Sequence, residues 1–360
     1  MRAWKIVAAV ALALGLAALL DARGLRKTAV IQPPGLGRDV AMAVTAPLVR
    51  VSDFLYLDRP RQELKEVLGR AADDRIDTRI VLPAVPATPR AQVAPRLAAV
   101  VQAPVKPHAE PKPKPKAAPK PKPKPKPQPK PKPRPAFSPS HPLRIWVAGD
   151  SLAVVPGQSL EAATASSGAV DVVSVESRLA TGLGRPEIFN WFERIDQAVA
   201  ELHPNVAVLS FGADDDHDYM SGVPAGVKLG PLGSPSWTAE YRRRAAGVQA
   251  ELTRAGVYVV WLGLPITRGE GWNRPFRTIN KILKGVAAAS PDHAYFLGTY
   301  ALFQDSRGRY AEYLPNGHGQ LVRMRSGDGV HYQPPAGDLI ARLVLHRLNQ
   351  VFDLTSWKAK

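Results

Sequence analysis

The residues of this sequence best suited to chemistry are a serine, an aspartate and a histidine in its C-terminal half. Ser151 follows an apolar run that ends in Gly149 and Asp150, where a strand should give way to a helix. Asp328 and His331 lie three residues apart in a loop before the last helical pattern. Each motif alone is common in ordinary turns. Because a hydroxyl nucleophile needs a base, and that base needs an orienting carboxylate, together they predict a catalytic triad.

Short apolar runs alternate with amphipathic stretches from residue 143 onward, and these elements must position the triad. The expected strands are Leu143–Ala148, Asp171–Val175, Val206–Phe211, Val257–Leu262 and Ala294–Leu297. The expected helices lie near Gln158–Ser166, Glu187–Leu202, Thr238–Ala255, Phe276–Ala288 and Gly337–Leu348. Several strands are continuous apolar runs, which suits a parallel sheet buried on both faces. The pattern predicts a three-layer α/β/α sandwich with a mainly parallel five-stranded sheet, and ligands beyond the carboxyl ends of its strands.

The order of four short blocks resembles the SGNH (GDSL-type) hydrolase superfamily, and more narrowly its N-terminally anchored cell-envelope members. The blocks are Gly149-Asp150-Ser151, Thr181-Gly182-Leu183, Phe211-Gly212-Ala213-Asp214-Asp215, and Asp328 with His331. The resemblance implies that Ser151 attacks an ester carbonyl, His331 takes its proton and Asp328 holds the imidazole tautomer. It also implies an oxyanion hole formed by the backbone N–H groups of Ser151 and Gly182.

The third block departs from the family pattern, because Asp214 stands where the family has an asparagine that donates to the oxyanion. An ionised carboxylate cannot donate, and losing one such donor costs on the order of 100–1000-fold in rate. Three explanations stay open. Neighbouring carboxylates keep Asp214 protonated, His217 replaces it as a donor, or the site is impaired and serves an activated donor or binding alone. Arg325 and Tyr332 are further candidates, for contact with a polar substrate.

Other polar clusters have plainer interpretations. The acidic run from Asp214 to Asp218 lacks calcium-loop spacing, so we expect no metal and no cofactor. Arg242, Arg243 and Arg244 are expected on a solvated helix face, and Trp261 in the core. The chain has no cysteine, which excludes disulfides and thiolate chemistry.

The charge of the chain is concentrated near its N-terminus. The net charge is +17, and residues 1–140 carry 26 of the 48 basic residues but only 10 of the 31 acidic ones. The predicted folded domain is therefore nearly neutral. We expect no nucleic-acid partner, because that would require basic residues on a folded face.

The N-terminus carries a membrane signal. An uncharged apolar run, Ile6–Leu20, is flanked by basic residues on both sides. Its length fits the core of a signal peptide, but a good cleavage site is missing. We favour an uncleaved signal-anchor, with a cleaved signal peptide as the alternative.

A proline-rich segment separates this signal from the domain. Residues 111–135 contain twelve prolines and ten basic residues, which exclude helix and sheet and favour an extended rod. We interpret it first as a spacer, with contact to an anionic envelope polymer as a compatible role. The predicted organisation is a signal-anchor or signal peptide (1–27), a partly helical membrane-proximal segment (28–95), a Pro/Lys-rich linker (96–140) and the hydrolase-like domain (141–355).

These features together predict a serine esterase tethered to a bacterial inner membrane, with its domain in the periplasm. Its expected reaction is the removal of O-acyl groups, in the first place O-acetyl, from an envelope polysaccharide or peptidoglycan. The alternatives are an O-acetyltransferase that uses the same triad with a membrane acyltransferase as donor partner, and a degenerate SGNH binding module. If the signal is cleaved, the protein is secreted to the periplasm.

Overall fold

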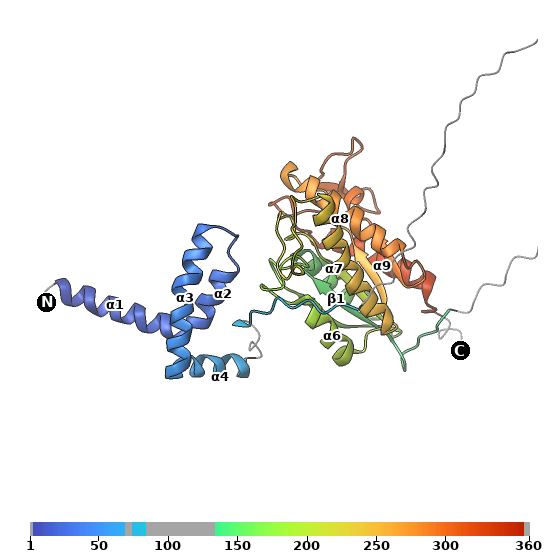
Figure 1. Cartoon of the computed structure of the whole chain (residues 1–360). Helices are drawn as coiled ribbons and strands as arrows, with labels where there is room; N and C mark the ends of the chain where they lie inside the picture. The colour runs from blue at the N-terminus through green and yellow to red at the C-terminus, as the bar shows by residue number, and fades with distance from the viewer. Residues whose placement is uncertain (1–2, 69–73, 84–133, 356–360) are drawn as a thin grey trace, which may run out of the picture.

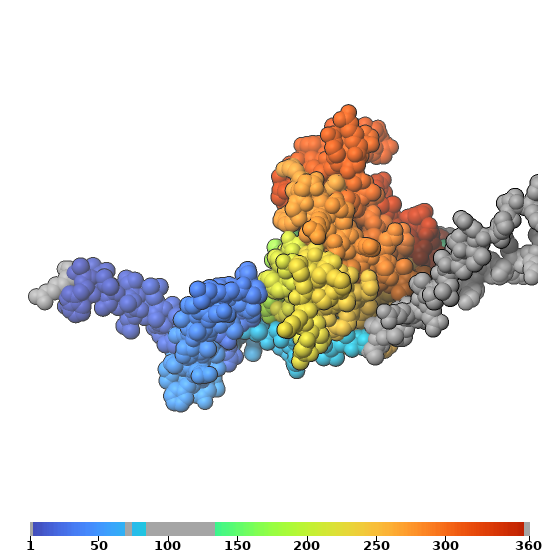
Figure 2. Space-filling model, turned by 45° about the horizontal axis from the view of Figure 1, so that its top comes forward, coloured from blue at the N-terminus to red at the C-terminus, as the bar shows by residue number. Residues whose placement is uncertain are grey.

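The computed structural model describes residues 3–68, 74–83 and 134–355 (Figure 1). Residues 3–68 form a small helical unit, and residues 134–355 form a larger α/β domain. The segment 74–83 runs in extended form along the surface of that domain, where it is visible in cyan in Figure 2.

A five-stranded sheet with all strands parallel forms the centre of the domain. The strands are β1 (Leu143–Gly149), β2 (Val170–Ser177), β3 (Val206–Ser210), β4 (Tyr258–Leu262) and β5 (Ala294–Leu297). Their spatial order is β2-β1-β3-β4-β5. The chain moves from β1 to β2 on one side and then to β3 on the other, so the direction of winding reverses at β1. Ligands of open parallel sheets bind at such a reversal, beyond the carboxyl ends of the strands.

Helices cover both faces of this sheet. They are α5 (Val154–Thr164), α6 (Trp191–Leu202), α7 (Pro235–Arg254), α8 (Glu270–Ala288) and α9 (Pro334–Val351), with short 3₁₀ turns η2 (Ser151–Ala153) and η3 (Tyr300–Phe303). Helices α5 and α9 pack against each other, and α7 packs against α6 and α8. The core includes four fully buried tryptophans, namely Trp146, Trp191, Trp237 and the predicted Trp261.

The predicted fold is confirmed, because all five strands and all five helices of the domain occur close to their expected ranges. One element was missed. An antiparallel hairpin of β6 (Tyr313–Pro315) and β7 (Leu321–Arg323) stands between β5 and the loop that carries Asp328. Its strands are only three residues long and partly exposed. They therefore lack the continuous apolar run that marked the central strands.

The N-terminal unit has four helices. They are α1 (Ala3–Leu20), α2 (Ala22–Val30), α3 (Leu36–Leu55) and α4 (Arg59–Val67). The first has a mean hydropathy of 2.2 and no buried residue. It is compatible with a membrane anchor or with a signal sequence. Helices α2 and α3 pack against each other, and α1 contacts both.

Two extended segments dock on the domain, one on each side of the proline-rich sequence. In the segment 74–83, Ile80 and Leu82 pack against the core, and the carbonyl of Arg79 accepts a hydrogen bond from the Asn190 side chain at 3.0 Å. At the other end Phe137 donates its backbone N–H to Asp353 at 2.9 Å. The domain thus includes residues 134–140, which the sequence assigned to the linker. Most of the predicted rod lies outside the described residues.

Candidate active site

Ser151 lies directly beyond the carboxyl end of β1. At this strand end Gly149 adopts φ of +156°, and a Cβ there would stand 1.9 Å from the carbonyl oxygen of Ser210. Only glycine permits this approach, which lets Asp150 donate its backbone N–H to the same carbonyl at 2.9 Å. The close passage of β1 and β3 turns the chain and presents Ser151 at the edge of the sheet.

Asp150 fixes this turn from beneath. Its carboxylate is fully buried and accepts the backbone N–H of Leu152 at 2.9 Å and that of Ala213 at 3.0 Å. The first bond caps the turn that begins with Ser151, and the second ties it to the third block. Burial, followed by the nearby Asp214, raises the pKa of Asp150 well above its ordinary value.

The three predicted triad residues form a continuous hydrogen-bond chain. The Nε2 atom of His331 lies 2.8 Å from the Ser151 Oγ, and its Nδ1 atom lies 2.7 Å from the Asp328 Oδ2. The histidine and aspartate side chains are 43% and 48% exposed, so the chain opens to solvent. Sequence positions 180 residues apart thus meet with the geometry of a nucleophile, its base and an orienting carboxylate.

The loop that carries Asp328 holds it as an anion. Burial alone would raise the pKa of Asp328. The backbone N–H groups of Val330 and His331 and the His331 side chain outweigh it and lower the pKa to about 2. Gly329 completes the turn with φ of +76°, and a Cβ there would stand 2.5 Å from the Arg268 side chain. Asp328 therefore stays ionised at any ordinary pH, as an orienting carboxylate must.

Arg325 and Tyr332, the sequence's candidates for contact with a polar substrate, are both buried. The Arg325 guanidinium donates to the backbone carbonyls of Ile266, at 2.7 Å, and of Val330 and His331. It also stacks on the ring of Tyr332, whose hydroxyl lies 3.4 Å from the Thr299 Oγ1. Burial raises the pKa of Tyr332 to about 12. Both residues brace the loop that carries His331 from its buried side.

The Gly182 loop depends on a residue that the sequence interpretation did not single out. Asp215 is buried and accepts the backbone N–H of Leu183 at 2.9 Å, that of Gly184 at 2.7 Å and the Tyr241 hydroxyl at 2.8 Å. Burial raises the pKa of Asp215, while these donors oppose the rise. A Cβ on Gly182 would stand 2.3 Å from its Oδ1, so the loop closes over the carboxylate only with glycine.

Arg244 supports the same loop from the other side, so its predicted place on a solvated face is wrong. It is fully buried and donates to the carbonyls of Leu183 at 2.8 Å, Gly184 at 3.2 Å and Ser221 at 2.6 Å. Glu240, one helical turn earlier, accepts from it at 2.7 Å. A buried cation paired in this way is the usual exception to arginine's surface preference.

Two backbone donors remain unused near Ser151. The N–H groups of Ser151 and Gly182, which the resemblance assigns to the oxyanion hole, have no acceptor among the described residues. These are the groups that an oxyanion would need.

Asp214 follows Ala213, which is tied to Asp150 beside the nucleophile. The Oδ2 atom of Asp214 is buried and has no hydrogen-bond partner within the described parts of the chain. Burial, and then Asp215 and Asp216, raise the pKa of Asp214 to about 6, against the opposing effect of His217 and His331. Asp214 is therefore far easier to protonate than an ordinary aspartate.

A five-stranded parallel sheet with Ser, His and Asp joined at its carboxyl edge defines an SGNH-hydrolase-like domain, as the resemblance implied. Residues 144–347 match the family described as "Protein of unknown function (DUF459)", and the chain belongs to this family. No curated protein matches the sequence.

Solved structures with a similar fold include three enzymes. A GDSL-like lipase from Bacteroides thetaiotaomicron is 13% identical, with 58% of this chain and 88% of that chain covered and a TM-score of 0.38. An acetylxylan esterase from Geobacillus stearothermophilus is 15% identical, with 59% and 95% covered and a TM-score of 0.37. A carbohydrate acetylesterase from Sinorhizobium meliloti is 11% identical, with 58% and 99% covered and a TM-score of 0.39. These likenesses assign no substrate to this chain.

Proposed function

We propose that the protein is a serine esterase that transfers the acyl group of an ester first to Ser151 and then to water. The observation that carries this proposal is the hydrogen-bond chain from the Ser151 Oγ through His331 to Asp328. In this geometry His331 removes the hydroxyl proton while the oxygen attacks the carbonyl. It then returns the proton to the leaving alcohol, and Asp328 stabilises the imidazolium formed between the two steps.

The oxyanion of the tetrahedral intermediate would be bound by the free N–H groups of Ser151 and Gly182. Asp150 and Asp215 hold these two groups in place through the turn and the loop that bear them. A protonated Asp214 would add a third donor. Preorganised donors of this kind are worth about 100–1000-fold in rate each.

The proposed substrate is an O-acyl group, in the first place O-acetyl, on a glycan of a bacterial cell envelope. The apolar helix α1 supports this choice, because it is compatible with a tether or a secretion signal. We propose the orientation in which the domain lies in the periplasm. The envelope polymer is then the ester-bearing partner within reach.

The test uses the full-length protein in detergent micelles and an acetylated sugar as substrate. We expect release of acetate that Ser151→Ala abolishes, together with covalent labelling of the native serine by a fluorophosphonate. Ser151→Ala retains the fold because the substitution removes a single partly exposed oxygen, and circular dichroism checks this. If both proteins release acetate at the same rate and neither is labelled, the esterase proposal fails.

Acetyl transfer to a glycan hydroxyl is a second candidate, and the carboxylate at Asp214 favours it. An ionised Asp214 weakens the oxyanion hole, which disfavours slow reactions such as hydrolysis of unactivated esters more than transfer from an activated donor. Supplying an activated acetyl donor together with a glycan acceptor separates the two candidates. Acetylated glycan in excess over free acetate supports transfer, and free acetate alone supports hydrolysis.

A further inference from the structure

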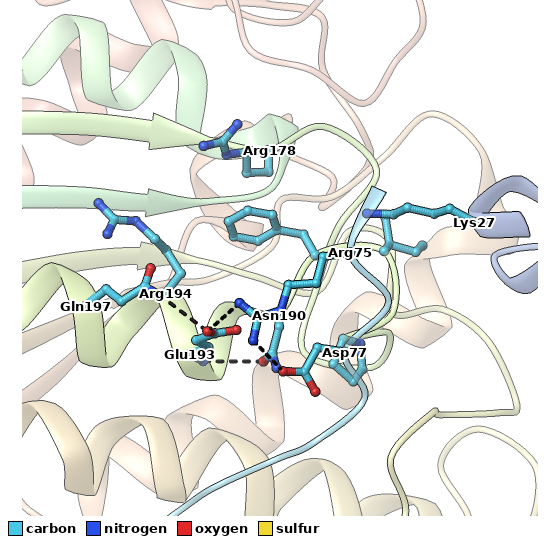
Figure 3. Close-up of a pocket in the computed structure, with 11 residues that line it drawn as sticks. Lys27, Arg75, Asp77, Arg178, Asn190, Glu193, Arg194 and Gln197 are labelled. Atoms are coloured by element: carbon cyan, nitrogen blue, oxygen red, sulfur yellow. Dashed lines mark hydrogen bonds and ion pairs between the residues drawn. The ribbon is translucent and has the colours of Figure 1, made fainter. Parts of the chain in front are cut away.

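The catalytic edge of the domain faces the N-terminal helical unit. The carbonyl of Ile31, just after α2, accepts a hydrogen bond from Arg185, which follows the Gly182 loop. Lys27 of α2 lines a pocket together with Arg178 and Asn190 of the domain (Figure 3). Arg178 stands immediately beyond the end of β2, and in Figure 3 the strands point toward α2. The edge of the sheet that bears Ser151 is therefore the edge nearest to the N-terminal helices.

Helix α3 has two unlike faces. Thr45 and Ser52 are buried, on the side that packs against α2. Large apolar residues at spacings of three, four and seven are exposed elsewhere along its length. This α3 stripe consists of Leu36, Val40, Val44, Val51, Phe54 and Leu55, of which Phe54 is 81% exposed. A continuous apolar stripe of this kind on an exposed helix marks a binding surface.

The position of α1 indicates what covers the stripe. Helix α1 is uncharged and apolar from Ile6 to its end at Leu20, contacts α3 and extends away from the domain (Figure 1). Helix α3 runs across α1 rather than along it, with α2 between α3 and the domain (Figure 1). If α1 crosses a bilayer, α3 lies at the surface of that bilayer with the face opposite α2 turned to the lipid.

Helix α3 is poorly suited to cross the bilayer itself. It carries Arg38, Asp39, Arg50 and Asp53 within twenty residues, and α2, packed on its other face, carries three basic residues. The chain bends by 86° between α3 and α4. A helix with an apolar stripe and charged flanks lies in the plane of the membrane interface.

We propose that the α3 stripe rests on the lipid bilayer and holds the catalytic edge toward the membrane, so that the enzyme acts on esters of lipid-anchored glycans. This proposal rests on the proposed function for its chemistry and adds the class of substrate. In this arrangement only α2 and α3 separate the site from the bilayer, so a glycan held by a lipid tail stands within its reach. A polymer distant from the membrane does not.

The surface contact is tested without reference to activity. The chain has no cysteine, so Val44→Cys and Val67→Cys give single labelling sites on the full-length protein. Both residues are exposed valines, at 56% and 84%, but Val67 is the last residue of α4, a helix that runs away from α1 (Figure 1). With an environment-sensitive fluorophore in phosphatidylcholine vesicles, nitroxide lipids should quench the label at position 44 and aqueous iodide the label at position 67.

Two outcomes overturn the lipid contact. One is equal quenching of both labels by iodide. The other is shielding of position 44 that disappears when the protein is diluted in lipid, which would show that a second copy covers the stripe. Neutral lipid is used so that the basic residues of α2 cannot produce the result by charge alone.

The substrate class is tested with two acetylated sugars that differ only in an alkyl tail, both supplied to protein in vesicles. Val44→Glu should lower kcat/KM about tenfold toward the tailed sugar, the loss expected from one valine contact with lipid. It should leave the rate on the tailless sugar unchanged, and Val67→Glu should change neither. If the unmodified chain hydrolyses neither sugar, the esterase proposal itself fails. Equal rates on the tailed sugar for Val44→Glu and the unmodified chain overturn this inference alone.

Discussion

In the proposed mechanism, Asp214 decides how well the site stabilises the negative charge of the oxyanion, because deprotonation changes it from a hydrogen-bond donor to a repelling anion. Its pKa, raised to about 6 by burial and by Asp215 and Asp216, places that change near neutral pH. The raised pKa also affects folding stability. The contribution of Asp214 to the stability of the folded state is fully present below its ordinary pKa near 3.8 and is lost as the pH rises through about 6.

The first prediction concerns the pH profile. We expect kcat/KM to fall as the pH rises through about 6, and Asp214→Asn to remove this fall, because an amide donates at every pH. At alkaline pH the variant should exceed the native rate by about 100-fold. Asp216→Asn is the matched control: it removes a charge that raises the Asp214 pKa, so the fall should move to lower pH. Identical profiles for all three proteins contradict a donor role for Asp214.

Arg325 belongs to the same scale, since its single guanidinium holds the loop that carries His331, the proposed base. It donates to the backbone carbonyls of Val330, His331 and Ile266. We expect Arg325→Lys to lower kcat with little change in KM, because a single ammonium cannot hold three carbonyls in a fixed fork. Each carbonyl left without a donor costs about 1–3 kcal/mol of folding stability. Native kcat together with a native Tm in Arg325→Lys would contradict this positioning role.

Site residues that lie in short sequence motifs could be predicted from the sequence, whereas residues that reach the site only through tertiary contacts could not. Ser151, Asp328 and His331 were found because nucleophile, base and carboxylate occur in recognisable local contexts. Arg244 and Arg325 were assigned to solvent or substrate because arginine is rarely buried. Their burial depends on carbonyl oxygens from loops distant in sequence, which no local pattern reveals. The one available signal for Asp215 was its place beside Asp214 in the third block.

At the scale of elements, the segment 74–83 joins the helical unit to the domain as a docked strap. Its Leu82 side chain fits against α7 where Gly247 leaves space, since a Cβ at that glycine would stand 2.6 Å from Leu82. Asn190, which caps α6, and Glu193 within α6 hold the same segment through Arg79 and Arg75. No periodicity marks this segment in the sequence, because residues 75–83 form no helix or strand and are held only by their contacts with the domain.

Filling the space at Gly247 should release the strap. We expect Gly247→Val to expel Leu82 and to raise hydrogen exchange of backbone amides in the segment 74–83, at a cost of about 2 kcal/mol from the lost burial. Gly285→Val on α8 is the matched control, because nothing lies within 4 Å of its Cβ position and the helix-propensity cost is the same. Equal exchange in both variants would show that the strap is not docked there.

At the scale of the whole molecule, the placement of the strap changes the interpretation of the proline-rich sequence. Residues 74–83 reach the domain before that sequence begins, and residues 134–138 return to the domain after it, beside Asp353. A spacer between membrane and domain must have one end on each. Both ends of this one lie on the domain, so it does not separate the helical unit from the domain. The spacer interpretation does not fit these flanking contacts.

Deleting residues 111–130 should therefore leave the rate on a lipid-anchored acetylated sugar unchanged. The strap and the contacts of residues 134–138 are untouched, and the remaining residues between them can still close the connection, because loop-closure entropy varies slowly with length. Binding to an anionic envelope polymer should weaken, since most of the positive charge of this stretch is removed. Replacing the lysines of the same stretch by serine separates length from charge, and should reproduce the weaker binding at full length. A deletion that lowers the membrane-anchored rate while the serine variant does not would restore the spacer role.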